Sequence, residues 1–104
     1  MLLLSEELKA RLPPLGQSGC DPDPMVYARL FLPGTSWNFY VIEGEIEAGY
    51  WVVFCLFVTN ERVGFSPFPL DLLEELRSEE GQPLVLDPDF TEGRLTDVVP
   101  PPEL

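Results

Sequence analysis

Histidine is absent from this sequence of 104 residues, and lysine occurs only once, at Lys9. Without histidine, the catalytic triads and dyads that use an imidazole base are excluded, and so are zinc sites with histidine ligands. The phosphate-binding motifs GxxxxGKS, GxxxxGKT and GxGxxG are also missing, as is CxxC. These absences predict a protein that is not an enzyme and that holds no cofactor and no metal.

Cysteine occurs twice, at Cys20 and Cys55. Cys55 lies inside an apolar run, where a thiol acts as a small buried side chain. Cys20 lies in a loop of Gly, Asp and Pro residues. A reducing compartment argues against a disulfide, and the sequence leaves open whether the two thiols approach each other.

Long hydrophobic segments are lacking as well. The start, MLLLSEELK, has no basic region before its short apolar run, so no signal peptide is expected. The longest apolar run, Tyr50 to Val58, is about half of the roughly 20 residues that a membrane helix needs. We therefore expect a cytoplasmic protein that does not bind membranes.

Positive charge is scarce: 6 Lys and Arg face 18 Asp and Glu, a formal net charge of −12. Binding to a nucleic-acid backbone requires clustered Lys and Arg, so direct nucleic-acid binding is not expected. A charge-driven partner would be basic: a cation, a basic ligand, or the nucleic-acid-binding surface of another protein. The alternative is that the charge serves solubility alone.

The length is that of one domain, 1–104. Short spacings between β-rich stretches favour a meander-like antiparallel sheet of four to five strands with two short helices, an α+β fold. Ser5 is placed to cap the first helix, and Pro13 follows it. The expected elements are an N-terminal helix in 1–12, antiparallel strands in 25–66, a helix in 67–80, a last strand in 83–90, and an extended Pro-rich tail in 97–104.

The run YWVVFCLFV, Tyr50 to Val58, is rich in β-forming Val and Phe. Both faces of such a strand would be apolar, whereas a half-exposed antiparallel strand alternates apolar and polar residues. We therefore expect a central strand covered on one side by the helices. The other side would be covered by the N- or C-terminal segments or by a partner, such as a second copy in a homodimer. The candidate interface residues are Tyr50, Trp51, Val53 and Phe57.

Carboxylates are the only abundant chemical resource. Glu43, Glu45 and Glu47 alternate along a strand, about 6.7 Å apart, and could bind a hard cation or stay solvated. The stretches 21–24 and 87–89 alternate Asp with Pro, which is typical of turns closed by Asp side chains. A wider hypothesis is an acidic surface that mimics nucleic acid, although its spacing is about twice that of DNA phosphates. Its residues are Glu43, Glu45, Glu47, Glu74, Glu75, Glu79 and Glu80.

An aromatic group beside a carboxylate can line a ligand pocket. Trp37, Tyr40 and Glu43 follow one another closely enough in sequence to form a candidate pocket of this kind. The alternative is that Trp37 and Tyr40 simply pack in the core or on the sheet.

A distinctive set of residues occurs along the chain: Pro24, Tyr27, Phe31, Pro33, Ser36, Trp37, Glu43, Gly44, Gly64 and Phe65. The order of these motifs resembles a bacterial family of short single-domain proteins of unknown function, often encoded on plasmids and other mobile elements. The likeness spans about residues 2–99. It departs at Asp87-Pro88-Asp89, where the family tends to show an acidic-basic pair and this chain has no Arg.

The resemblance supplies no mechanism. The sequence favours a non-enzymatic, protein-binding accessory protein of a bacterium or its mobile elements. The alternatives are an acidic inhibitor that mimics nucleic acid, and a small-ligand or cation binder that uses carboxylates.

Overall fold

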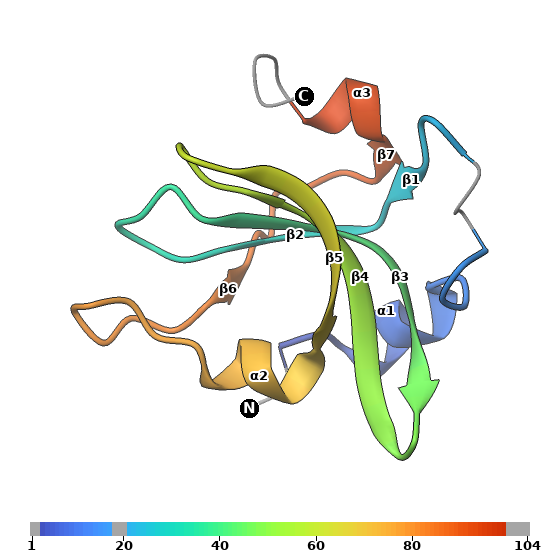
Figure 1. Cartoon of the computed structure of the whole chain (residues 1–104), viewed down its shortest axis with the longest axis horizontal. Coiled ribbons are helices and arrows are strands. Elements are labelled where there is room, and N and C mark those ends of the chain that lie inside the picture. Colours follow the sequence, from blue (N-terminus) through green and yellow to red (C-terminus); the bar gives the residue numbers. More distant parts are fainter. Residues whose placement is uncertain (1–2, 18–20, 100–104) are drawn as a thin grey trace.

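A computed structural model describes residues 3–17 and 21–99 of the chain. It contains three short helices, a five-stranded antiparallel sheet and a two-stranded sheet, so the predicted α+β class is confirmed (Figure 1). In chain order the elements are α1 (Glu6–Arg11), β1 (Met25–Val26), β2 (Ala28–Phe31), β3 (Asn38–Glu47), β4 (Tyr50–Val58), β5 (Val63–Pro69), α2 (Leu70–Glu75), β6 (Val85–Leu86), β7 (Gly93–Arg94) and α3 (Leu95–Val98).

The large sheet has the strand order β5-β4-β3-β2-β6. Strands β2 to β5 form the predicted meander, and β6 adds to its far edge beside β2. The small sheet, β1 with β7, was not predicted, because strands of two residues are too short to show an alternating pattern.

Three expected elements differ from the structure. The last strand expected in 83–90 covers only Val85–Leu86. The helix expected in 67–80 covers only Leu70–Glu75, because β5 continues through Pro69 before the chain turns into α2. In the segment expected to be an extended tail, Asp97 and Val98 belong to helix α3. Residues 100–104 of that tail, and Cys20, lie outside the described residues.

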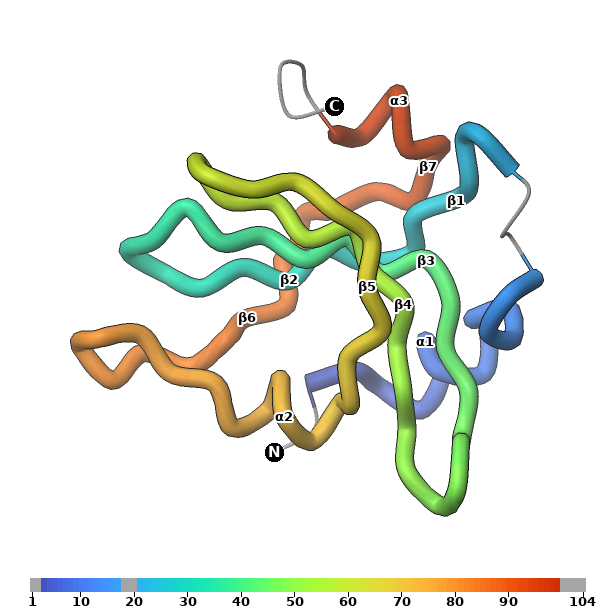
Figure 2. The backbone as a smooth tube through the Cα atoms, viewed as in Figure 1, coloured from blue at the N-terminus to red at the C-terminus, as the bar shows by residue number. Residues whose placement is uncertain are grey.

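Strand β4 lies between β3 and β5, and the chain itself covers both of its faces, though not to the same extent. Val53 and Cys55 face a cluster built with leucines of α1 and α2, whereas Leu56 and Val58 face a cluster that includes Leu95. Figure 2 shows the same division, with α1 and α2 on one side of the sheet and α3 on the other. Coverage by the chain's own ends therefore accounts for much of the apolar run.

The first helix reaches the sheet through a close contact at Gly44. Ser5 caps α1 by accepting a hydrogen bond from the Leu8 N–H at 3.1 Å. After α1 the chain crosses the edge of β3, where the Gly44 N–H donates to the Pro13 carbonyl at 2.9 Å. A Cβ at Gly44 would lie 2.9 Å from Leu12 Cδ1, so only glycine fits here without displacing the neighbouring side chain.

Candidate functional site

One face of the β4–β5 hairpin carries apolar side chains that stay partly or largely exposed among residues 3–17 and 21–99. Cross-strand partners in a sheet point to the same face, and β4 pairs with β5 so that Phe54 opposes Pro67 and Leu56 opposes Phe65. We call this surface the apolar strip. It consists of Tyr50, Val52, Phe54, Val63, Phe65 and Pro67.

Large apolar side chains of the strip are open to solvent. Tyr50 is 64% exposed, and Val63 and Phe65 are each 52% exposed. The rings of Phe54 and Phe65 stack at 5.9 Å with an interplanar angle of 8°, which makes the surface continuous across the two strands. The second core cluster buries Leu56 and Val58 on this face, and Phe54 packs against that cluster and stays partly exposed.

The strip borders an edge of the sheet, since β5 pairs with β4 alone among the strands that the structure describes. At the hairpin turn the Thr59 N–H donates to the Arg62 carbonyl at 2.8 Å, which sets the alternation of hydrogen bonds along the hairpin. By this alternation Val63 and Phe65 direct their N–H groups away from β4. Pro67 and Pro69 occupy the next two outward positions and have no N–H, a common protection of edge strands.

The acidic row predicted on β3 flanks the strip, because Glu47 opposes Tyr50 and Glu45 opposes Val52. Its three carboxylates are not equivalent. Glu43 is only 2% exposed and accepts a hydrogen bond from the Gly16 N–H at 2.8 Å. Glu45 accepts one from the Leu15 N–H at 2.6 Å, and Glu47 is exposed.

Two of these carboxylates therefore hold the loop that follows α1, and the interpretation of this row as a solvated surface is wrong for Glu43. The wider acidic surface is interrupted again at α2, where Glu74 Oε2 accepts a hydrogen bond from the Leu3 N–H at 3.0 Å. Glu75, Glu79 and Glu80 remain exposed. Three of the seven predicted surface carboxylates thus accept hydrogen bonds from backbone N–H groups of the chain.

The predicted pocket of Trp37, Tyr40 and Glu43 does not form. Trp37 packs edge-on against Phe57, with ring centroids 5.4 Å apart, on the side of the sheet that faces α1 and α2. Tyr40 belongs to the cluster on the opposite side, and Glu43 is buried. Residues three apart on a strand point to opposite faces, so Trp37 and Tyr40 could not share a wall.

The predicted interface strand is likewise divided between the two faces of β4. Val53 is fully buried, and Trp51 and Phe57 pack against the same cluster, so the chain itself covers this face. The prediction is therefore wrong for Val53, and only Tyr50 lies on the uncovered strip. Phe54, Val63 and Phe65 were missed, although the prolines at 67 and 69 indicate an edge strand in the sequence.

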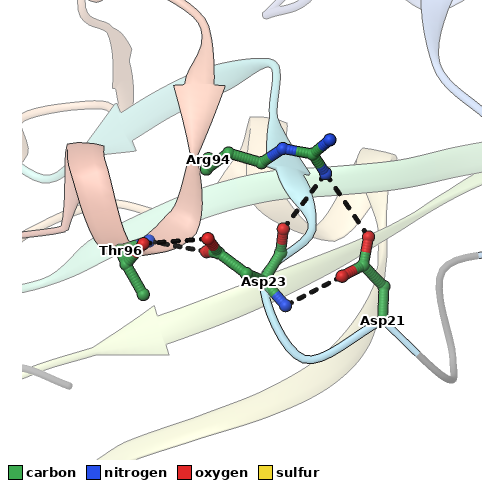
Figure 3. Close-up of polar contacts among 4 residues, drawn as sticks. All are labelled: Asp21, Asp23, Arg94 and Thr96. Atoms are coloured by element: carbon green, nitrogen blue, oxygen red, sulfur yellow. Dashed lines mark hydrogen bonds and ion pairs between the residues drawn. The ribbon is translucent and has the colours of Figure 1, made fainter.

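The Asp-Pro stretches form the predicted turns. Asp21 Oδ1 accepts a hydrogen bond from the Asp23 N–H at 2.9 Å, and Asp87 Oδ1 accepts one from the Asp89 N–H at 3.0 Å. Figure 3 shows Asp23 between Thr96 and Arg94, whose guanidinium donates to the Asp23 carbonyl at 3.2 Å. Within residues 3–17 and 21–99, no group of three acidic or cysteine side chains is placed to hold a metal ion.

A second polar group lies beside β2. Arg29 Nη1 donates to Asp87 Oδ2 at 2.9 Å, and Arg29 Nε donates to Asn38 Oδ1 at 3.0 Å. The pKa of Asp87 lies below its ordinary value, first because of the hydrogen bond from the Asp89 N–H and second because of Arg29. The ion pair of Arg29 and Asp87 joins β2 to the segment that follows β6. We therefore interpret it as a structural contact.

Cys55 offers no reactive thiol. It is fully buried, and burial raises the pKa of its thiol far above the ordinary value.

In the part of the chain that the structure describes, no helix is both long and apolar enough to cross a membrane. Comparison of the chain with protein-family models, with curated proteins and with solved structures finds no match.

Proposed function

We propose that this chain is a non-enzymatic, protein-binding accessory protein of the bacterial cytoplasm or of a mobile element, and that a partner protein docks on the apolar strip. The observation that carries the proposal is the pair of exposed aromatic residues, Tyr50 and Phe65, on a sheet face where Leu56 and Val58 are buried. A contiguous apolar surface rimmed by polar residues is typical of protein interaction sites.

The rim of the strip defines the chemistry of the partner. Glu47 lies beside Tyr50 on β3, and the chain as a whole carries a formal net charge of −12. A partner with an apolar centre and basic residues at its edge would complement both features. A second copy of the chain would bring two acidic rims together, so self-association through this face would be weakest at low ionic strength.

The other two interpretations have less support. A mimic of nucleic acid needs an uninterrupted array of free carboxylates, and Glu43, Glu45 and Glu74 are each bound to a backbone N–H of the chain. A cation binder needs several carboxylates around one point, and the described residues form no such group.

The proposal is tested by placing the photo-crosslinking residue p-benzoylphenylalanine at Phe65 in the protein expressed in its bacterial host. The control places it at Leu72, which is 55% exposed on α2 and lies outside the strip. We expect a discrete cross-linked partner from position 65 that is absent from position 72. Identical products from the two positions, or none from position 65, would contradict the proposal.

The molar mass in solution identifies the class of partner. Light scattering at low and high salt should give a monomer at low salt. The contrary result is the molar mass of a dimer at both low and high salt. If the substitution Phe65→Ser then gave a monomer, the partner would be a second copy of this chain.

A further inference from the structure

On the opposite side of the sheet from the apolar strip, Trp37 lines a pocket with a volume of about 350 Å³. One wall is the connection between β2 and β3, residues 32–37, and the other is the connection between α2 and β6, residues 76–80. The volume is at the lower end of the range for ligand pockets, roughly 300–1,000 Å³. The pocket is therefore suited to a single side chain or a small group.

Hydrogen bonds within each connection hold both walls in place. In the first, the Thr35 N–H and hydroxyl both donate to the Leu32 carbonyl, at 3.1 and 2.8 Å. In the second, the Gly81 N–H donates to the Ser78 carbonyl at 2.9 Å, and Gly81, with a φ of +85°, takes the left-handed position that ends a three-residue loop. The pocket is thus formed before any ligand arrives.

The lining of the pocket includes one aromatic residue, Trp37, and two acidic residues, Glu79 and Glu80. Trp37 is 38% exposed, and the edge-on contact with Phe57 fixes the orientation of its ring. Glu79 and Glu80 stand at the tip of the turn in the second wall, and both are exposed. An indole and two carboxylates that line one pocket favour a cation, which gains from the ring quadrupole and from charge pairing together.

Arg77 also lines the pocket, and its guanidinium already donates hydrogen bonds to backbone carbonyls. Arg77 Nη1 donates to the carbonyls of Glu74 and Leu76, at 2.9 and 2.8 Å. Elsewhere the chain places its own cations on aromatic rings, with Lys9 Nζ 5.5 Å from the centroid of Trp51. Among the described residues, no Lys or Arg stacks on Trp37 in this way.

We propose that the Trp37 pocket binds an arginine side chain presented by a basic segment of a partner protein. The planar guanidinium stacks on the indole of Trp37 and pairs with Glu79 and Glu80 at the rim. Arginine is favoured over lysine because its weakly hydrated, planar group both stacks on aromatic faces and pairs with carboxylates. This site lies on the other face of the sheet, so it stands whether or not a protein docks on the apolar strip.

The test follows the two tryptophan indole N–H signals by NMR during titration of the full chain with the peptide acetyl-Gly-Arg-Gly-amide. Trp51 serves as an internal reference, and Trp37→Phe assigns the signals. We expect the Trp37 signal to move while the Trp51 signal stays in place. The same peptide with citrulline, which has the shape of arginine without its charge, should leave both signals unchanged.

Substitutions at the rim separate a charge-paired site from non-specific binding. Glu79→Gln and Glu80→Gln should each weaken the arginine peptide roughly two- to five-fold, the range of a single exposed ion pair. Glu75→Gln, an exposed residue outside the pocket, should not change the affinity.

Three results would overturn the proposal. One is an unmoved Trp37 signal at arginine peptide concentrations up to about 10 mM, a range that detects millimolar dissociation constants. Another is equal binding of the citrulline peptide, or of a peptide with Glu in place of Arg. The third is an affinity that Glu75→Gln reduces as much as Glu79→Gln and Glu80→Gln do.

Discussion

Asp23 and Thr96, 73 positions apart in the sequence, are joined by two hydrogen bonds. Asp23 Oδ1 accepts from the Thr96 N–H and Oδ2 accepts from the Thr96 hydroxyl, both at 2.9 Å (Figure 3). Arg94, at the N-terminal end of α3, makes no capping hydrogen bond with its side chain, so Asp23 caps the helix from a distant part of the chain. This contact holds Leu95 of α3 against the sheet.

Replacing Asp23 with Ala should therefore loosen the C-terminal part of the chain. Loss of a helix cap costs about 0.5–2 kcal/mol, and we expect that reduction in the free energy of unfolding by urea. Amide hydrogen exchange should accelerate in 95–99 while β4 remains protected. Uniform acceleration across the sheet, or an unchanged α3, would contradict the capping role.

Gly44 and Gly64 form a matched pair for testing the contact between α1 and β3. Gly44→Ala should destabilise the protein by about 1–3 kcal/mol, because its Cβ would lie 2.9 Å from Leu12 Cδ1 and 3.3 Å from Val53 Cγ1 in a packed core. Gly64→Ala on β5 meets nothing within 4 Å and should be close to neutral. Thermal unfolding of the two variants checks the difference, and equal melting temperatures would contradict it.

Glu43 and Glu47 lie on the same strand and differ in burial. Glu43→Ala removes a buried acceptor of the Gly16 N–H and should cost about 1–3 kcal/mol. Glu47→Ala, at an exposed position, should stay within about 0.5 kcal/mol of the parent protein. Urea unfolding of both variants measures the contrast. If Glu47→Ala were the more damaging change, the acidic row would have a role that the fold does not explain.

The depressed pKa of Asp87 gives a contribution to stability that depends on pH. Because the folded pKa lies below the unfolded value of about 3.9, the stabilisation is fully present above the unfolded value. It is lost as the pH falls through the folded pKa. The difference in free energy of unfolding between the parent protein and Asp87→Asn should thus be constant at neutral pH and shrink below about pH 4.

Urea unfolding of the parent protein and the Asp87→Asn variant across this pH range measures that difference. Glu61→Gln, at an exposed turn position, is the control and should show little difference from the parent protein at any pH. A gap between the parent protein and Asp87→Asn that widens in acid would reverse the assigned sign.

The central strand could be predicted from the sequence because nine consecutive apolar residues leave both faces of β4 in need of cover. Which face the chain would leave partly open could not be predicted, since that depends on where Leu95 and Val99 pack. The hydrogen bond that Glu43 accepts could not be predicted from the sequence either, because it also depends on tertiary packing. Its partner, the Gly16 N–H, lies 27 positions away and reaches it only after α1 has docked on the sheet.

The sequence predicts that Trp37 and Tyr40 point to opposite faces of the sheet, because side chains alternate with a period of two along a strand. Leu76 and Glu79, which line one pocket with Trp37, come from a connection distant in the sequence. No local pattern links them. The second wall of the pocket therefore required the structure.

The two core clusters also differ in when they can be completed during synthesis. The cluster beneath α1 and α2 requires no residue beyond Leu86, whereas the opposite one needs Phe90, Leu95 and Val99. A chain leaving the ribosome can therefore assemble the meander and its first two helices while the other side of the sheet, including Leu56 and Val58, is still bare. During that interval the nascent protein would depend on dilution or on a chaperone to stay unassociated.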